Sequence, residues 1–258
     1  MYKNLHFEYI KGKKNSNYKF VFLHGWGHSI ENERPIANIL SDYDCYLVDL
    51  PGFGKSPAPE NVMGVSDYAN LIAEFIKSFK TDNDKIFLIG HSFGGRVSID
   101  LGANHPNLIS KIFIISGAGL KKKQKIGKKI STWCLQKINK LGHKVYKICG
   151  NDFSKTKIYD KLYNKLASSD YKNAHNIMRE IIKKTIRTSS IPMAKKLSVP
   201  TILIYGENDT ITPPYFGERF HKLIKNSKLF ILPMFTHNSI LTDGRFQVAS
   251  IILTNIGE

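Results

Sequence analysis

The chain has 258 residues, of which 42% are hydrophobic and 23% charged, and this balance argues against a disordered, collagen-like or coiled-coil protein. No apolar stretch approaches the roughly 18 residues that span a bilayer, and the first residues lack the apolar run of a signal peptide, so we expect a cytoplasmic protein with one large domain, or one domain with an insertion. The formal net charge is +17, and the three cysteines have no CxxC spacing, which argues against a disulfide framework and a zinc site.

The N-terminal part predicts strand, strand, helix, strand, helix. Short β-rich apolar runs at 5–10, 19–25 and 45–52 predict the three strands. Apolar residues recur at helical spacing between 66 and 79, with Ser66 as the expected N-cap. The following elements alternate between buried strands and a helix: strand 85–90, helix 93–104 and strand 111–119.

Residues 121–196 differ from the rest of the chain in pattern and in charge. They show helical periodicity and no strand signal. They contain 21 Lys and Arg against four acidic residues, whereas the remainder of the chain has 17 of each sign. The whole net charge therefore lies in one internal segment, which predicts a separate helical unit with its own partner.

Strand signals resume after this segment. Residues 199–209 and 227–238 predict two strands, with a helix at 216–224 between them and a last helix at 240–255. Strands that alternate with helices predict an α/β fold with a mostly parallel sheet and helices on both faces. The domains expected are a core of 1–120 and 197–258 and an inserted helical unit of 121–196.

A serine follows directly on a buried strand and precedes a helix. Gly90-His91-Ser92-Phe93-Gly94 matches the G-x-S-x-G nucleophile elbow, in which a serine occupies a sharp strained turn and small neighbours let the strand and helix approach closely. The pattern alone is weak, and its position between a strand and a helix strengthens it. We interpret Ser92 as a candidate nucleophile.

A glycine-rich turn follows an earlier strand, at His24-Gly25-Trp26-Gly27. Such a turn can direct a backbone N–H toward a ligand. Together with the N–H of Phe93, the N–H of Trp26 would form an oxyanion hole for a tetrahedral intermediate. The alternative is that both glycine-rich loops only turn the chain.

A serine hydroxyl needs a base and an acid that orients the base. Asp209 directly follows the strand residues TILIYGEN (201–208), and His237 follows KLFILPMF (228–235), so both are expected at the same edge of the sheet as Ser92. The chain order Ser, Asp, His is the order of the α/β-hydrolase triad. Glu207 is the alternative acid.

These motifs together resemble α/β-hydrolase-fold serine hydrolases over nearly the whole chain outside the insertion: HGWG, DLPGFGKS, GHSFGG, GENDTITP and the late histidine occur in that family's order. The resemblance implies Ser92 as nucleophile, Asp209 as acid and His237 as base, with a helical cap at 121–196. It implies acyl transfer to serine and then to water, with no metal or organic cofactor. HGWG and LVDLPGFGKS also resemble pimeloyl-carrier-protein methyl ester esterases.

The charged segment is compatible with several kinds of substrate and partner. The implied substrate is a small-molecule acyl ester or thioester. A basic lid can attract an acidic acyl donor such as an acyl carrier protein. It can equally bind an anionic membrane surface, as in a lipase or lysophospholipase, through aromatic residues such as Trp133, Tyr146, Tyr159, Tyr163 and Tyr171. A solvated lysine surface without a partner is a further alternative, and nucleic acid is not favoured, because no nucleic-acid module is recognisable.

A different class of function is a non-catalytic binding protein on the same fold. The presence of Ser92, Asp209 and His237 together argues against it.

Overall fold

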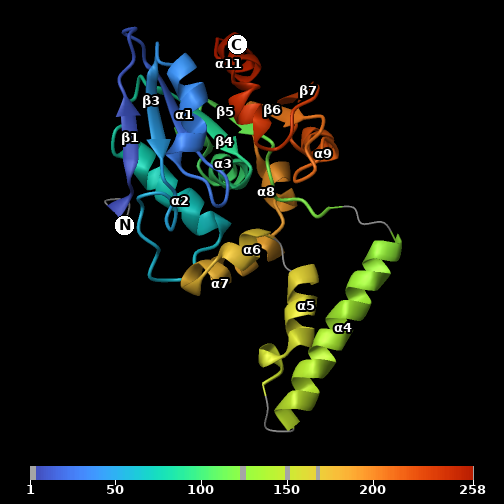
Figure 1. The fold of residues 1–258 in the computed structure, drawn as a ribbon. Coiled ribbons are helices and arrows are strands. Elements are labelled where there is room, and N and C mark those ends of the chain that lie inside the picture. Colours follow the sequence, from blue (N-terminus) through green and yellow to red (C-terminus); the bar gives the residue numbers. More distant parts are fainter. Residues whose placement is uncertain (1–3, 123–125, 149–151, 167–168, 258) are drawn as a thin grey trace. The chain divides into compact units, whose positions relative to one another are not determined.

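The structure is a computed structural model that describes residues 4–122, 126–148, 152–166 and 169–257. For residues 126–134, 148, 160, 163–166 and 169 it describes the backbone but not the side chains. Its central feature is a seven-stranded sheet (Figure 1). The strands are β1 (Phe7–Ile10), β2 (Tyr18–Leu23), β3 (Asp44–Val48), β4 (Lys85–His91), β5 (Lys111–Ile115), β6 (Thr201–Gly206) and β7 (Ser227–Leu232).

The strand order is β1-β3-β2-β4-β5-β6-β7. Strands β2 to β7 run parallel, and β1 pairs antiparallel with β3. The chain moves outward from β2 to β3, then crosses back to β4 on the other side of β2. Open α/β sheets place their ligand sites at such a change of direction, beyond the carboxyl ends of the strands, which here are those of β2 and β4.

The helices flank the sheet and form the inserted segment. They are α1 (Ile30–Ile39), α2 (Val65–Lys77), α3 (Phe93–Asn104), α4 (Ile126–Ile148), α5 (Lys157–Leu166), α6 (Ser169–Asn173), α7 (Asn176–Arg187), α8 (Ile191–Lys196), α9 (Tyr215–Leu223), α10 (Ser239–Thr242) and α11 (Arg245–Thr254), with 3₁₀ turns at Pro106–Leu108 and Phe153–Lys155. None of the helices in the described part of the chain is long and apolar enough to cross a membrane.

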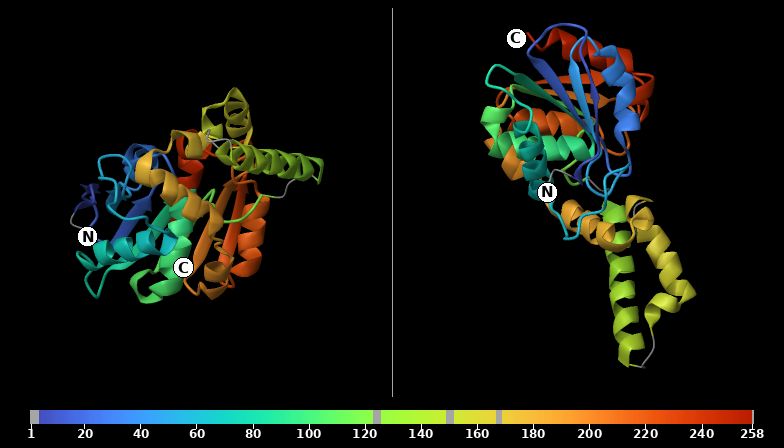
Figure 2. Two further views of the ribbon diagram at one scale, coloured as in Figure 1. Left: turned by 90° about the horizontal axis from the view of Figure 1, so that it is seen from below. Right: turned by 90° about the vertical axis from the view of Figure 1, so that its left-hand side faces the viewer.

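Two apolar clusters cover the two faces of the sheet. One cluster packs α2, α3 and α9 against it, and the other packs α1, α10 and α11 (Figure 2, right). All residues of β5 and β6 are buried, which explains their continuous apolar sequences. Burial on both faces confirms the predicted α/β architecture.

Two predicted helix details were wrong. Helix α2 begins at Val65 with Gly64 as N-cap, because the Asp67 carboxylate accepts the Gly64 N–H at 2.6 Å, while the Ser66 hydroxyl bonds Asp100 instead. The last predicted helix is divided into α10 and α11. Its first turn closes where Gly244 N–H donates to the Ser239 carbonyl oxygen at 2.9 Å.

The chain forms two compact units, one of residues 1–120 and 176–258 and one of residues 121–175. Helices α7 and α8, which fall within the basic segment predicted at 121–196, are part of the first unit. The reason is apolar packing, since Ile181 and Ile182 of α7 are buried in the core. Lys184 on the same helix bonds the Val62 carbonyl oxygen at 3.2 Å.

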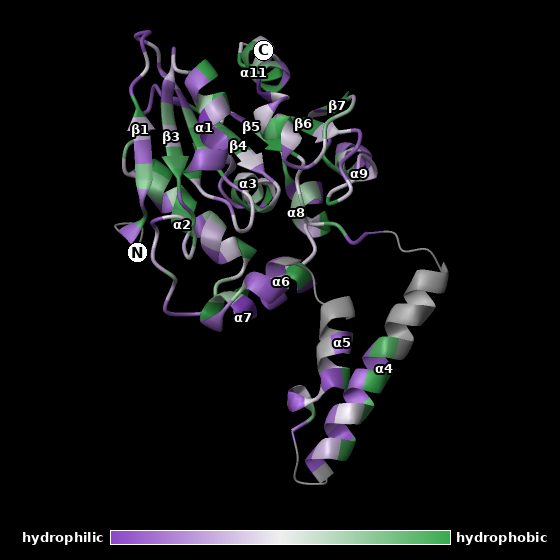
Figure 3. Ribbon diagram, in the orientation of Figure 1, coloured by the Kyte–Doolittle hydropathy of each residue, from purple (hydrophilic) through white to green (hydrophobic). Residues whose placement is uncertain are grey.

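The second unit contains α4, α5 and α6, with 15 lysines against three aspartates. Phe153 of this unit is buried, and three ring centroids lie near its own: His143 at 5.2 Å, Tyr146 at 5.2 Å and Tyr159 at 6.0 Å. The coloured part of α4 in Figure 3 alternates between hydrophilic and hydrophobic residues. The side chains of Trp133, Cys134 and Tyr163, and all of Cys149, lie outside the described residues.

Candidate active site

Ser92 occupies a sharp turn between β4 and α3. Its backbone has φ +49° and ψ −106°, a conformation that non-glycine residues rarely adopt. Gly90 and Gly94 have no room for a side chain, since a Cβ on Gly94 would collide with the Leu23 carbonyl group and one on Gly90 would lie 2.6 Å from Gly94. The Ser92 N–H donates to the Ile115 carbonyl oxygen at 3.0 Å, which holds the turn against β5.

His237 brings the three predicted residues together. Its Nε2 lies 3.0 Å from Ser92 Oγ, and its Nδ1 lies 2.7 Å from Asp209 Oδ2. Ser92 follows β4, Asp209 follows β6 and His237 follows β7, so the carboxyl ends of three parallel strands supply the set. A carboxylate only accepts hydrogen bonds, so Nδ1 carries the proton and Nε2 can accept the Ser92 hydroxyl proton.

The Asp209 carboxylate is buried, and one of its oxygens accepts two backbone hydrogen bonds. Oδ1 accepts the N–H groups of Ile211 and Thr212 at 2.7 and 2.8 Å. Burial by itself would raise the pKa of Asp209, but the hydrogen bonds from His237 and Thr212 outweigh it and hold the pKa below its ordinary value. Asp209 is therefore ionised at neutral pH.

Thr212 is a further member of this network that the sequence did not reveal. Its Oγ1 lies 2.9 Å from Asp209 Oδ2, 3.1 Å from His237 Nδ1 and 2.8 Å from the Ser116 carbonyl oxygen. Ser116 has φ +48°, and this left-handed backbone presents its carbonyl group to Thr212. The only sequence signal was the position of Thr212, three residues after Asp209.

The ring of His91 is next to that of His237, with 4.8 Å between centroids. Its Nε2–H donates to the His237 carbonyl oxygen at 3.1 Å, and its ring is stacked on His28 with 5.4 Å between centroids. Burial, followed by the nearby His237 and His28, lowers the pKa of His91 well below its ordinary value. His91 is therefore neutral and supports the backbone of His237, which agrees with a structural role in the elbow loop.

The loop that carries Trp26 lies against the Ser92 turn. The Gly94 N–H donates to the His24 carbonyl oxygen at 3.1 Å, and a Cβ on Gly25 would lie 3.3 Å from Ser92 Cβ. A tight turn places Trp26 and Gly27 between Gly25 and His28, with the His28 N–H bonded to the Gly25 carbonyl oxygen at 3.2 Å. The two predicted backbone donors are thus on adjoining loops.

Both donors are available for a ligand. Phe93 is the first residue of α3, so its N–H has no partner within the helix. The N–H of Trp26 makes no hydrogen bond with another residue that the structure describes. The Trp26 ring packs edge-to-face on Phe93 and Phe53, with centroids 5.4 and 4.8 Å apart.

His24 is fixed within the same loop. Its Nδ1–H donates to the Gly25 carbonyl oxygen at 2.7 Å, and its Nε2 accepts the Leu50 N–H at 3.0 Å. Burial lowers the pKa of His24 to about 4, so the ring is neutral at physiological pH. This pair of bonds ties the loop after β2 to the loop after β3.

Glu207, the alternative acid, has a different partner. Its Oε2 accepts the Met234 N–H at 3.3 Å, while His237 is bonded to Asp209. Within the described part of the chain, no group of three or more His, Cys, Asp or Glu residues could hold a metal ion.

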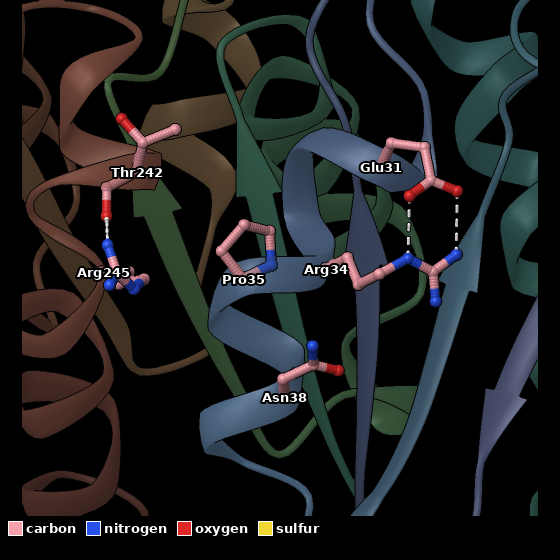
Figure 4. Close-up of a pocket in the computed structure, with 6 residues that line it drawn as sticks. All are labelled: Glu31, Arg34, Pro35, Asn38, Thr242 and Arg245. Carbon is pink, nitrogen blue, oxygen red and sulfur yellow. Dashed lines mark hydrogen bonds and ion pairs between the residues drawn. The ribbon is translucent and has the colours of Figure 1, made fainter.

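A surface hollow of about 360 Å³ lies between α1 and the α10–α11 segment (Figure 4). Arg34 on its wall is bonded to Glu31 at 2.8 Å, and Arg245 bonds the Thr242 carbonyl oxygen at 2.5 Å. None of the Ser92 site residues lines this hollow, so it is separate from that site.

The arrangement of Ser92, His237 and Asp209 can perform nucleophilic chemistry. The imidazole can take the serine proton as Oγ attacks a carbonyl carbon, and the buried carboxylate can stabilise the imidazolium that forms. Two adjoining backbone donors can stabilise the oxyanion.

Comparison with known proteins gives consistent results. The family model described as alpha/beta hydrolase fold matches residues 18–244. An uncharacterized hydrolase, YugF, of Bacillus subtilis is 25% identical over 245 residues, which are 91% of this chain and 88% of that protein. A pimeloyl-[acyl-carrier protein] methyl ester esterase of Wigglesworthia glossinidia brevipalpis is 29% identical over 239 residues, which are 86% of this chain and 87% of that protein.

Among solved structures, an esterase from Exiguobacterium antarcticum superposes with a TM-score of 0.71 at 22% identity. The superposition covers 98% of this chain and 96% of the esterase.

Proposed function

The chain belongs to the alpha/beta hydrolase fold family and is a hydrolase, and on that premise we propose that it cleaves a carboxylic ester or thioester through an acyl-serine intermediate on Ser92. The observation that carries this proposal is the pair of hydrogen bonds at His237, 3.0 Å to Ser92 Oγ and 2.7 Å to Asp209 Oδ2.

Acylation begins when Ser92 Oγ attacks the carbonyl carbon and its proton moves to His237 Nε2. The tetrahedral intermediate collapses by breaking the bond to the alcohol or thiol leaving group, which takes the proton from Nε2. The products of this half-reaction are the free alcohol or thiol and the acyl-Ser92 ester.

Deacylation repeats the same proton transfers with water. His237 Nε2 takes a proton from a water molecule as its oxygen attacks the acyl carbon, and returns it to Ser92 Oγ as the acyl bond breaks. The carboxylic acid leaves, and the enzyme is regenerated. No oxidant, reductant or metal ion enters the balance of either half-reaction.

The backbone N–H groups of Trp26 and Phe93 stabilise the negative charge on the substrate oxygen. Phe93 lies at the N-terminus of a 12-residue helix, where the helix dipole adds to the effect. Asp209 keeps the His237 ring in one tautomer and stabilises its protonated form, and Thr212 contacts both groups.

The test is covalent labelling with a fluorophosphonate, which reacts only with an activated serine. We expect wild-type protein to be labelled and to hydrolyse p-nitrophenyl esters, while Ser92→Ala does neither. A chain that resists the probe and hydrolyses none of a graded ester series would instead be a non-catalytic binding protein.

A second proposal concerns the unit 121–175, which we infer recruits an acidic acyl donor such as an acyl carrier protein. Its 15 lysines against three aspartates support this, because a positive field attracts acidic proteins. A relative named pimeloyl-[acyl-carrier protein] methyl ester esterase supports it further.

The competing proposal is that the same unit binds an anionic membrane surface, as a lipase or lysophospholipase would. Exposed apolar residues on α4 and α5, such as Leu141 and Ile158, favour it. Co-sedimentation with anionic vesicles would support the membrane, and a complex with acyl carrier protein would support the carrier protein.

A further inference from the structure

Arg96 is a buried cation one helical turn after Ser92. The residue is only 6% exposed. Side chains in a helix lean toward its N-terminus, so the Arg96 side chain leans toward the turn that begins at Ser92. Its Cγ lies 3.5 Å from the position that a Cβ on Gly119 would occupy. Gly119 belongs to the loop after β5, where Ala118 N–H bonds the Ser92 carbonyl oxygen at 3.0 Å.

The charge of Arg96 is not neutralised by the described residues. Its Nη2 donates to the Thr188 carbonyl oxygen, while its Nε is buried without a hydrogen-bond partner. Burial lowers the pKa of Arg96 to about 10, so the guanidinium stays charged at neutral pH. A buried cation with one carbonyl partner is costly unless a counter-ion joins it.

The sequence offers Arg96 a counter-ion that the fold does not use. Asp100 is four residues further along α3, the spacing at which helical ion pairs form. Its carboxylate instead accepts the Ser66 hydroxyl at 3.0 Å and the Asn104 amide at 2.9 Å. Arg96 thus makes no ion pair with this acid, and its guanidinium reaches the Thr188 carbonyl oxygen instead.

We propose that Arg96 binds a carboxylate group of the substrate, so that the enzyme prefers esters or thioesters that carry a free carboxylate near the bond that is cleaved. This inference rests on the function proposed above. The guanidinium has five N–H donors in a planar fork that matches a carboxylate, and one carbonyl contact leaves donors for such a group. The carboxylate can belong to the acyl part or to the leaving group.

Two pairs of esters distinguish these sources. For the acyl part, the mono-p-nitrophenyl ester of glutaric acid is compared with its methyl-capped neutral diester. For the leaving group, the butyrate ester of 4-hydroxybenzoate is compared with that of methyl 4-hydroxybenzoate. We expect wild-type kcat/KM to favour the acidic member of one pair, and the favoured pair identifies the source.

Substitution of Arg96 tests its part in that preference. The ratio of acidic to neutral kcat/KM should fall about 10²-fold in Arg96→Gln. Arg96→Lys keeps the charge but loses the fork, so its ratio should fall by about tenfold. Arg187→Gln is the matched control, because Arg187 is an exposed arginine just before Thr188, and its ratio should stay at the wild-type value.

Binding of carboxylate probes to the Ser92→Ala variant tests the Arg96 site separately from hydrolysis at Ser92. Monomethyl glutarate and 4-hydroxybenzoate are the probes, and one of them should raise the melting temperature of Ser92→Ala but not of Ser92→Ala/Arg96→Gln. If wild-type protein hydrolyses no ester while this shift is seen, the proposed function fails and the carboxylate site stands.

The carboxylate site is overturned if wild-type protein favours neither acidic ester and neither probe shifts the melting temperature. It is also overturned if Arg96→Gln lowers activity on both members of each pair equally, since Arg96 would then only hold the Thr188 loop. Should Arg96→Gln fail to fold, the wild-type ratios and Arg96→Lys decide the matter.

Discussion

The sheet with its flanking helices and the unit 121–175 differ in how they use charge. Next to Ser92, the side chains of His237, Asp209 and Thr212 form one hydrogen-bonded network with contacts of 2.7–3.1 Å. In the unit 121–175, lysines exceed aspartates fivefold, and apolar residues such as Leu141 are largely exposed. Chemistry needs fixed short distances, whereas attraction of a charged partner needs only a field.

The difference suggests that bond cleavage and partner recruitment are separable. Substitutions around Ser92 should change kcat for every ester, and substitutions in the unit 121–175 should change only the association of charged substrates.

The largest expected effect tests the first half of this comparison. Ser92→Ala, His237→Ala and Asp209→Asn should each lower kcat by at least about 10³-fold, because the three residues act as one unit, and double variants should lose little more. Steady-state hydrolysis of p-nitrophenyl butyrate measures this, with circular dichroism to verify folding. Glu207→Gln is the control and should retain activity. Near-wild-type activity in Ser92→Ala would exclude Ser92 as the nucleophile.

The next effect concerns the backbone donors. Trp26→Pro removes an N–H and should lower kcat by about 10² to 10³, whereas Trp26→Phe keeps the N–H and should retain most activity. The same assay compares the two variants. Equal losses would place the oxyanion donor at another residue.

A smaller effect is expected at Thr212. Thr212→Val keeps the shape but removes the hydroxyl that contacts Asp209 and His237, so kcat should fall by about tenfold, and Thr212→Ser should restore it. The pH profile of kcat is the second readout, because a packing defect would not move its acidic limb. An unchanged limb in Thr212→Val would show that the hydroxyl does not act on His237.

The same variant has a stability consequence with a definite sign. The folded pKa of Asp209 lies below its ordinary value of about 3.8, so the stabilisation is present above that pH and is lost as the pH falls through the folded pKa. Thr212→Val should therefore lower the free energy of unfolding by about 1–2 kcal/mol at pH 7, with a smaller difference below about pH 4. Urea unfolding at several pH values measures this. A difference that does not change with pH would attribute the loss to packing.

The smallest effect tests the second half of the comparison. Lys140→Gln, Lys144→Gln and Lys147→Gln together should lower kcat/KM for an acyl-carrier-protein substrate about three- to tenfold at low salt, and added salt should remove the difference. Lys11→Gln, Lys222→Gln and Lys225→Gln are the matched control on the other unit. If the substitutions and added salt change kcat/KM equally for a neutral ester and for the carrier-protein substrate, the lysines form only a solvated surface.

The order of strands and helices along the chain could be predicted from the sequence, and so could the positions of Ser92, Asp209 and His237 after strands, because each of these strands has a strong local signal. The order of the strands within the sheet was not predicted. The roles of Thr212 and His91 were out of reach, because they depend on distances between residues far apart in the chain, such as His91 and His237. Cytoplasmic location, the absence of a cofactor and the partner of the basic segment stay predictions.

Helical periodicity could not divide the basic segment. An amphipathic pattern such as that of α7 is the same for a helix that packs on the sheet and for one that packs on other helices of the segment. The burial of Ile181 and Ile182 in the structure shows that α7 belongs with the sheet. The lack of a counter-ion at Arg96 could not be predicted either, because Asp100 is four residues away on the same helix, a spacing that favours an ion pair.

The inserted unit also bears on how the chain folds. Strands β5 and β6 are neighbours in the sheet, and the Ser190 N–H bonds the Gly119 carbonyl oxygen at 3.0 Å, so the chain leaves and returns at one place. Residues 121–175 nearly triple the length of chain between the two strands. Because the entropy of loop closure grows only with the logarithm of length, this insertion costs about 1 kcal/mol. Segments of very different length could therefore occupy this position with little effect on assembly of the sheet.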